Sequence, residues 1–202
     1  IKARGQLVCG VNTGLAGFSA ADSQGNWSGL DVDFCKAIAA TLLSDATKIK
    51  WAPLNAQQRF TALQSGEVDI LSRNTTWTAS RDATLGAVFA GTIFYDGQGF
   101  MVKKSANIKS ATQLNGATIC VITGATLELN IADFARSNGT KIGTLLFDKP
   151  DEAVAAMEAG RCDGYTDDTG SLAGMRSTLK NPADWVGGNP AGDITVVEFM
   201  DY

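Results

Sequence analysis

The chain of 202 residues contains no histidine. Without an imidazole, Ser-His-Asp and Cys-His catalysis cannot be built, and most zinc sites are excluded as well. No uninterrupted apolar run reaches the roughly eighteen residues that would predict a membrane-spanning helix. The formal charge of −4 provides no basic face for nucleic acid. We therefore expect a globular protein that uses no metal, no cofactor and no nucleic acid.

Cysteine is also scarce, and the four that occur are Cys9, Cys35, Cys120 and Cys162. None lies in a CxxC motif, so neither a zinc ribbon nor a thioredoxin-type redox pair is predicted. Two cysteines are early and two are late, and pairing within each half would stabilise the fold by roughly 3 kcal/mol per bridge. Four buried free thiols remain the alternative. If the bridges form, the compartment is oxidising, and the opening "IKARGQLVCG", which shows no signal peptide, fits a mature secreted chain.

Short apolar runs alternate with helical patterns in the first half of the chain. Strands are expected at 6–11, 48–54 and 68–71, and helices from residue 30 onward and at 56–66. Leu30, Phe34, Ile38 and Leu42 recur at four-residue spacing, which is one face of a helix. Gly66 stands where a helix C-cap prefers glycine. The order strand, helix, strand, helix, strand predicts an α/β sheet with parallel pairs.

The pattern then restarts after an extended segment at 92–104. Strands are expected at 117–122, 141–147 and 162–166, and helices at 125–139 and 150–160. The chain is therefore predicted to hold two α/β lobes. Their expected limits are 1–96 for lobe 1, 97–104 for a hinge strand, 105–185 for lobe 2 and 186–202 for an atypical tail.

A sequence pattern that occurs twice supports two lobes. "FTALQSGEVDIL" (60–71) and "VAAMEAGRCDGY" (154–165) share the frame A-x-x-x-G-x-x-D. Such helix–glycine–strand junctions are common, so the pattern alone could arise by chance. In both places, however, the strand runs into polar residues: Asn74, Thr75 and Thr76 in the first, Thr166, Asp167, Asp168 and Thr169 in the second. Ligands of open α/β sheets bind beyond the carboxyl ends of strands, which makes these two segments the candidate site.

The polar segment "LSRNTTWTASRD" (71–82) places two arginines and many short donors after an apolar strand. Arg81 can hold a carboxylate bidentately, and an aspartate in the second lobe can accept from an ammonium, so the pair suits an α-amino acid zwitterion. In "TGATLELN", free N–H groups at the helix start near Thr126 can receive the same carboxylate. Ordinary capping by Thr123 or Thr126, and a surface pair of Arg81 with Asp82, remain the plainer alternatives.

Four stretches carry a family resemblance: "GVNTGLAGFSAADSQGNWSGLDVDFCKAIAA", "RFTALQSGEVDILSRNTTWTASRD", "FYDGQGFMV" and "AGRCDGYTDD". In these stretches the chain resembles bacterial periplasmic amino-acid-binding proteins of ABC importers, in particular the general L-amino-acid-binding branch. The resemblance implies a type II periplasmic binding protein fold, in which two α/β lobes close around a hinge on the ligand. It also implies an L-amino acid ligand, a membrane permease as partner and a periplasmic location.

The resemblance further implies a role for each matching residue. Phe18 matches the aromatic that lies against the ligand side chain, and Asn74 matches a group that accepts from the ligand ammonium by side chain or carbonyl. Thr76 and Arg81 match the carboxylate clamp, to which Thr126 adds a donor. Asp167 matches the acid that takes the ammonium, whereas Asp168 is expected to cap a helix. Paired cysteines fit this branch too.

The sequence departs from the branch within "VITGATLELN". Ile122, Ala125 and Leu127 stand where the branch usually shows polar residues, which predicts a more apolar second-lobe wall and a shift towards aliphatic ligands. The rival functions are an enzyme similar to cyclohexadienyl dehydratases on the same fold, or a truncated or chimeric binding protein without function. An enzyme would need Asp167, Asp168 or a lysine as its acid or base.

The tail "GNPAGDITVVEFMDY" (188–202) resembles the entry strand of periplasmic thioredoxin-fold oxidoreductases, but it lacks their CxxC. Alternation over 194–199 also fits a plain strand of the second lobe. The family-like sequence fades near Pro182, so we expect the first lobe to be incomplete. Either the tail strand patches an exposed sheet edge, or two copies complete each other as a homodimer.

Overall fold

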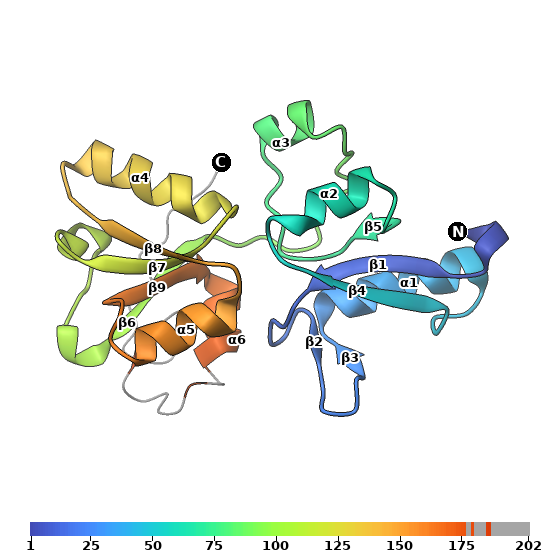
Figure 1. Cartoon of the computed structure of the whole chain (residues 1–202), viewed down its shortest axis with the longest axis horizontal. Coiled ribbons are helices and arrows are strands. Elements are labelled where there is room, and N and C mark those ends of the chain that lie inside the picture. The colour runs from blue at the N-terminus through green and yellow to red at the C-terminus, as the bar shows by residue number, and fades with distance from the viewer. Residues whose placement is uncertain (177–178, 180–184, 187–202) are drawn as a thin grey trace. The chain divides into compact units, whose positions relative to one another are not determined.

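The computed structural model of the chain describes residues 1–176, 179, 185 and 186. The chain divides into two compact units, residues 1–94 and residues 95–202 (Figure 1). Each unit is an α/β structure, as the alternating pattern of the sequence predicts.

The first unit is built on a three-stranded parallel sheet in the order β4–β1–β5. Its regular elements are the 3-10 helix Lys2–Arg4, β1 (Leu7–Asn12), β2 (Ala20–Ala21), β3 (Trp27–Ser28), α1 (Leu30–Leu43), β4 (Ile49–Leu54), α2 (Gln58–Gln64), β5 (Ile70–Leu71) and α3 (Ala79–Thr84). Side chains of β1 alternate between two cores. Leu7, Cys9 and Val11 pack with α1, whereas Val8 packs with Ala62 of α2, so the two helices cover opposite faces of the central strand.

Helix α1 forms where the four-residue spacing predicts it, but that stripe is not its buried face. Leu30, Phe34 and Leu42 are each more than a third exposed. The residues that α1 buries are Asp31, Val32, Cys35 and Ala39. The helix is apolar on several sides, so spacing alone could not identify the side that packs on β1.

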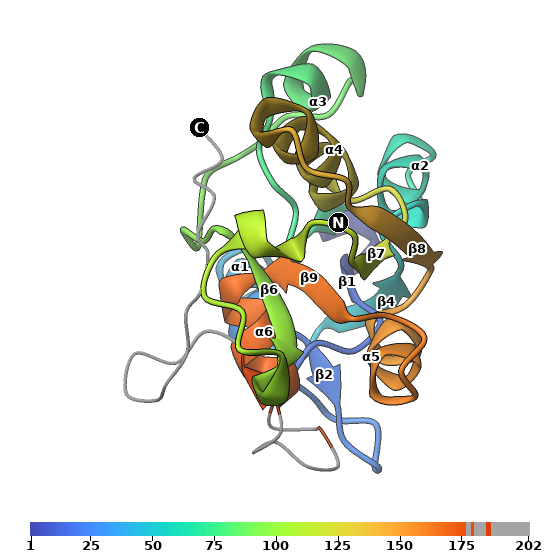
Figure 2. The ribbon, with the colours of Figure 1, turned by 90° about the vertical axis from the view of Figure 1, so that its left-hand side faces the viewer.

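The second unit holds a five-stranded sheet in the order β10–β6–β9–β7–β8. Its elements are β6 (Gln98–Lys103), the 3-10 helices Lys104–Ala106 and Ala111–Leu114, β7 (Thr118–Ile122), α4 (Thr126–Asn138), β8 (Gly143–Phe147), α5 (Pro150–Glu158), β9 (Gly164–Asp168), α6 (Thr169–Arg176) and β10 (Trp185–Val186). Strand β7 pairs in parallel with β8 and β9, whereas β6 runs antiparallel to β9. Helix α4 lies on one side of this sheet, and α5 and α6 lie on the other (Figures 1 and 2).

Within the extended segment expected at 92–104 only β6 is a strand, and β6 belongs to the sheet of the second unit. Strand β5 is likewise shorter than expected, and α3 was not predicted. Helix α6 begins directly after Asp168, which was expected to cap a helix. Both helices are short and begin inside the polar segments that follow β5 and β9. The possible tail strand at 194–199 lies outside the described residues.

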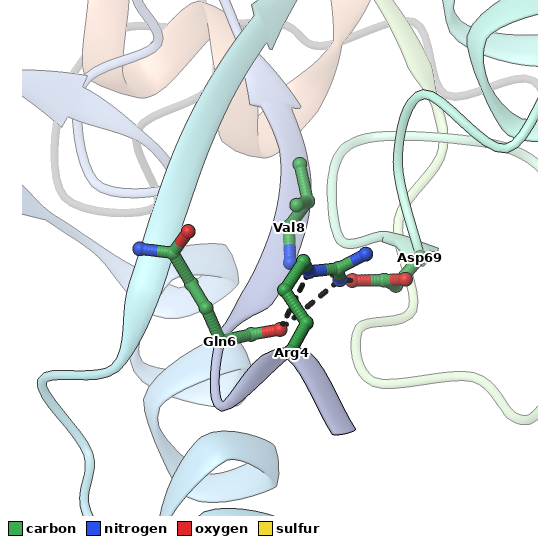
Figure 3. Close-up of polar contacts among 4 residues, drawn as sticks. All are labelled: Arg4, Gln6, Val8 and Asp69. Carbon is green, nitrogen blue, oxygen red and sulfur yellow. Dashed lines mark hydrogen bonds and ion pairs between the residues drawn. The ribbon is translucent and has the colours of Figure 1, made fainter. Parts of the chain in front are cut away.

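The repeated frame A-x-x-x-G-x-x-D has one structural explanation in both units. Asp69 donates its N–H to the carbonyl of Val8, and its carboxylate accepts the Val8 N–H at 2.7 Å (Figure 3). Asp163 makes the same two bonds with Thr118, each at 2.8 Å. In each unit the aspartate therefore anchors the start of an interior strand, β1 in the first unit and β7 in the second. In the first unit the Arg4 guanidinium, which also donates to the carbonyl of Gln6, adds an ion pair to the Asp69 carboxylate (Figure 3).

Both expected disulfides are confirmed. Cys9 on β1 is bonded to Cys35 on α1, with a Cα–Cα distance of 6.4 Å. Cys120 on β7 is bonded to Cys162, just before β9, with a Cα–Cα distance of 5.7 Å. All four sulfur-bearing residues are buried, and each bridge lies within one unit.

Replacing Cys120 and Cys162 together by serine should lower the free energy of unfolding by about 3 kcal/mol, because the unfolded chain would lose a covalent loop constraint. The matched variant replaces Cys9 and Cys35, whose bridge closes a shorter loop (26 rather than 42 residues of separation). Urea unfolding followed by circular dichroism measures both. Stabilities equal to that of the parent chain in both variants would contradict this contribution.

Among the helices within residues 1–176, none has the length and hydropathy needed to cross a membrane. The same part of the chain contains no group of three or more Cys, Asp or Glu side chains placed to hold a metal ion.

Candidate functional site

In the first unit, the segment after β5 brings Thr76 and Arg81 together. Thr78 caps helix α3, since its hydroxyl accepts the backbone N–H of Arg81 at 3.2 Å. The side chain of Arg81 turns back, and its Nη1 donates to the carbonyl of Thr76 at 2.9 Å. Its guanidinium also lies over the ring of Phe60, 5.3 Å from the centroid. The predicted clamp residues are therefore adjacent, and the guanidinium is half-buried in a defined position.

Asn74 is held by three neighbours that the sequence analysis did not single out. Its Oδ1 accepts from Asn12 Nδ2 and from Arg73 Nη2, each at 2.9 Å. Its backbone carbonyl accepts from Arg59 Nη1 at 3.1 Å, and the same nitrogen donates to Thr75 Oγ1 at 3.2 Å. The side-chain oxygen of Asn74 is thereby fully engaged, while its carbonyl keeps one lone pair.

Arg59 and Arg73 are buried, at 2% and 9% exposure. Arg73 belongs to the polar segment 71–82, called the donor-rich segment below, and Arg59 bonds to that segment at Asn74. Arg59 comes from α2 and also lies 4.9 Å from the centroid of the Phe60 ring. Arg73 reaches across to the carbonyl of Leu54, at the end of β4. Buried arginines are rare, and Arg59 could have been suspected from its place among the apolar residues of "RFTAL".

Asp31, in the first turn of α1, supplies a buried carboxyl to this network. Its Oδ2 lies 3.5 Å from the Ser19 hydroxyl, and its backbone carbonyl accepts from the Ser72 hydroxyl at 2.9 Å. Burial raises the pKa of Asp31 from 3.8 to about 6, although the charge of Arg73 and the hydrogen bond from Ser19 act in the opposite direction. Desolvation therefore outweighs the attraction of the guanidinium.

This raised pKa predicts that the Asp31 carboxyl makes the fold less stable as the pH rises. Between about pH 4 and 6 the folded chain holds a proton on Asp31 that the unfolded chain has released, so stability falls as the pH rises through this range. A pKa increase from 3.8 to about 6 corresponds to at most about 3 kcal/mol.

The measurement is the free energy of unfolding of the parent chain and of Asp31→Asn at pH 4.5 and pH 7. Relative to the variant, the parent should lose about 1–2 kcal/mol between the two pH values, since the asparagine cannot titrate. Parallel pH profiles would show that Asp31 titrates normally.

Phe18 belongs to a neighbouring part of the first unit. Its ring meets the ring of Phe94 edge-on, with centroids 5.1 Å apart. Its backbone is held by Gly29, which has a φ of +118° and lies so close that a Cβ there would be 2.3 Å from the Phe18 carbonyl oxygen. The next residue, Ser19, accepts the N–H of Asn12, and Asn12 in turn donates to Asn74. Asn12 thus links the Phe18 loop to the donor-rich segment.

In the second unit, Asp167 lies on β9 and is 3% exposed. The hydroxyl of the fully buried Tyr165 donates to its Oδ2, and the backbone N–H of Asp168 donates to its Oδ1 at 2.8 Å. Burial, and after it the charge of Asp167, raises the pKa of Tyr165 well above its ordinary value. The phenol therefore stays protonated and keeps the carboxylate in place. Asp168, one residue further along, is half-buried.

Thr126 is the first residue of α4, and the N-cap position is taken by Ala125, which makes no side-chain cap. Thr123 does not cap this helix either, because its hydroxyl and N–H both donate to the carbonyl of Phe147 on β8. The two plain capping alternatives therefore do not describe the start of α4.

A buried glutamine connects the start of α4 to strand β9. Nε2 of Gln98 donates to the carbonyl of Leu127 at 3.3 Å and to the hydroxyl of Thr166 at 2.9 Å. The hydroxyl of Thr166, which is itself fully buried, donates a hydrogen bond to the carbonyl of Gly99. Gln98 thus does in the second unit what Asn12 does in the first, since it bridges two candidate segments.

The three apolar residues at which the sequence departs from the general L-amino-acid-binding branch do not form an apolar wall. Leu127 belongs to the core cluster of the second unit, Ala125 packs against that cluster, and Ile122 is buried. The expected shift towards aliphatic ligands loses its structural basis, because these side chains contribute to the interior.

Asp96 is a further residue that the sequence analysis missed. Its carboxylate accepts from the N–H of Gly170 at 2.8 Å and from the hydroxyl of Thr169, both at the start of α6. The N–H of Thr169 donates to the carbonyl of Gly97. The N–H groups of Thr169 and Gly170 and the hydroxyl of Thr169 are therefore bonded to Asp96 and Gly97. The Thr169 side chain thus stabilises the start of α6.

Comparison with known proteins places this arrangement in a family. The model of the bacterial extracellular solute-binding proteins, family 3, matches residues 7–180. The chain belongs to this family. As a family 3 solute-binding protein it has the type II periplasmic binding protein fold, which confirms the fold class predicted from sequence.

Among similar proteins is the general L-amino acid-binding periplasmic protein AapJ of Rhizobium johnstonii, 55% identical over 186 residues, with 92% of this chain and 54% of AapJ covered. The glutamate/glutamine/aspartate/asparagine-binding protein BztA of Rhodobacter capsulatus is 52% identical, with 92% of this chain and 55% of BztA covered. This solute-binding chain thus spans about half the length of the curated relatives it matches.

A solved structure is similar as well. An ABC transporter periplasmic binding protein from Brucella ovis with glutathione bound aligns with a TM-score of 0.89 and 54% identity. The alignment covers 96% of this solute-binding chain and 60% of the Brucella protein. The family and these relatives are binding proteins.

Proposed function

We propose that the chain binds an L-amino acid as a zwitterion and delivers it to an ABC importer. The observation that carries this proposal is the position of Arg81, half-buried beside Thr76 and over the Phe60 ring, where its guanidinium can form a bidentate pair with a carboxylate. The names of AapJ and BztA, which bind amino acids, support the same ligand class.

In this proposal the first unit recognises the ligand carboxylate, through Arg81 and Thr76, and Phe18 lies against the ligand side chain. The second unit contributes Asp167, which takes the ammonium, and Thr126, which donates to the carboxylate. The Tyr165 hydroxyl and the backbone N–H of Asp168 hold the Asp167 carboxylate in a defined position, which supports its role as the acid that takes the ammonium. Binding would draw lobes 1–96 and 105–185 together about a hinge at 97–104.

The ligand class can be narrowed through the relatives. BztA is named for acidic amino acids and their amides, whereas AapJ is named for L-amino acids in general. We therefore propose acidic and amide side chains as the first ligands to test.

The same comparison supports a proposal for the partner and the compartment. Relatives named as periplasmic or as transporter-binding proteins support a membrane permease as the partner and the periplasm as the location. The two disulfides agree with an oxidising compartment. The expected homodimer has no support from the relatives and stays a prediction, which light scattering at micromolar concentration would test. The thioredoxin-like interpretation of the tail concerns residues that the structure does not describe.

A melting-shift screen against the twenty L-amino acids tests the proposed function. A ligand present at a hundredfold its Kd should stabilise the folded chain by about 2.7 kcal/mol. Turnover of a prephenate-like substrate, followed by product formation, distinguishes the dehydratase alternative. The proposal fails if none of the twenty amino acids raises the melting temperature.

A further inference from the structure

The side chain of Asn74 has a defined orientation in the first unit. Asn12 Nδ2 and Arg73 Nη2 both approach the same Asn74 atom at 2.9 Å. A guanidinium has only donors, so the atom that it meets must be the amide oxygen and not the amide nitrogen. The two donors use both lone pairs of Oδ1, and the amide therefore cannot turn over without placing its NH2 group against a guanidinium.

Because Oδ1 is bonded to Asn12 and Arg73, the NH2 group is the part of the Asn74 side chain that can meet a ligand. Among the described residues no hydrogen bond engages Nδ2, while Asn74 itself is half-buried. Its neighbours along the chain are Thr75, whose hydroxyl is bonded by Arg59, and Thr76, whose carbonyl is bonded by Arg81. Nδ2 is thus a positioned donor within the segment that carries the proposed carboxylate clamp.

The positive charges around residues 74–76 also favour a ligand oxygen at this segment. Three guanidinium groups bond directly to its residues 74–76, from Arg59, Arg73 and Arg81. Guanidinium groups bonded to these residues favour a ligand oxygen that is anionic or polar.

We propose that the Asn74 side chain donates a hydrogen bond from Nδ2 to an oxygen of the bound ligand, and does not accept from the ligand ammonium. This inference rests on the proposed amino-acid binding. The ligand oxygen is a carboxylate or amide oxygen, either of the α-carboxylate or of the ligand side chain. Asn74 is then a ligand-binding residue, held in the donor orientation by Asn12 and Arg73.

Asn74→Asp tests the inference through the sign of its effect. The aspartate keeps the shape of the side chain and an oxygen for Asn12 and Arg73, so folding should be preserved. It replaces the NH2 donor by an anionic oxygen. If Nδ2 faces a ligand oxygen, affinity should fall by about tenfold or more, through loss of the bond and repulsion. If that position faced the ammonium, the added negative charge would raise affinity.

Calorimetric titration of the parent and variant chains with L-glutamine and L-leucine separates the two ligand oxygens. Weaker binding of both amino acids identifies the α-carboxylate, and a loss confined to L-glutamine identifies its side-chain oxygen. Either result supports the donor role. Unchanged or tighter binding to the variant overturns it while leaving the proposed function intact.

Asn115→Asp is the matched control. Asn115 is exposed in the second unit, and its Oδ1 accepts from the N–H of Lys141 at 2.8 Å, a bond that aspartate retains. The Asn115→Asp substitution adds the same single negative charge outside the donor-rich segment, so the variant should bind both amino acids with the affinities of the parent chain. A parent chain that binds no L-amino acid in the melting-shift screen would overturn the proposed function, and the Asn74 inference with it.

Discussion

Replacing Arg81 by alanine is expected to abolish measurable amino-acid binding. The ligand carboxylate would lose the only guanidinium that we assign to it, and breaking one half of a desolvated ion pair costs about 3–5 kcal/mol. That cost weakens binding by roughly a hundredfold to several thousandfold. Calorimetric titration of the variant with the amino acid that binds the parent chain most tightly provides the measurement.

Arg136→Ala is the control for this loss of positive charge. Arg136 is an exposed residue of α4, with its side chain 76% exposed, and it pairs only at the surface with Asp133. Removing it should leave ligand affinity unchanged, because an exposed pair contributes about 1 kcal/mol at most to stability. Parent-like affinity in the Arg81 variant would refute the carboxylate assignment.

The second large effect is expected at Asp167. Asp167→Asn should weaken binding of L-amino acids by about tenfold to a hundredfold, because a charge-assisted bond to the ammonium contributes about 1.5–3 kcal/mol. Binding of the corresponding analogue without an amino group should be spared. The asparagine can keep an oxygen towards Tyr165, so the variant should still fold.

Asp168→Asn is the matched control, since it makes the same chemical change one residue along β9. Asp168 is half-buried and Asp167 is almost fully buried, and the two side chains of adjacent strand residues point to opposite faces. If the loss of ammonium-dependent binding occurs in Asp168→Asn instead, Asp168 is the acid and Asp167 only supports the strand end.

The architecture was largely predictable from the sequence, because strand and helix periods differ and glycines end helices. Gly66 and Gly160, for example, both adopt a φ of +76° after α2 and α5. The repeated aspartates were detected as a pattern, but their role was not. Asp69 and Asp163 anchor β1 and β7 through backbone bonds, and such bonds to residues 45 or more positions away leave no local signal.

The candidate site could be predicted only in part. The donor-rich segment was apparent because Arg81, Thr76 and Asn74 are close in sequence. Two residues that hold Asn74 come from other elements: Asn12 from β1 and Arg59 from α2. A sequence alone shows neither which atom of Asn74 these neighbours occupy nor that Leu127 lies in the core. The resemblance implies that Asn74 accepts from the ligand ammonium by its side chain or its backbone carbonyl. The bonded oxygen supports the donor role that we propose for the side chain and does not bear on the carbonyl.

The central claim is that the chain recognises both charged ends of an amino acid. One calorimetric experiment tests it directly, by titrating the parent chain with three ligands: L-glutamine, its analogue without the α-amino group and its analogue without the α-carboxylate. We expect saturable binding of one L-glutamine per chain and affinities lower by about tenfold or more for each analogue. Equal affinities for all three ligands, or no binding of any of them, would contradict the account.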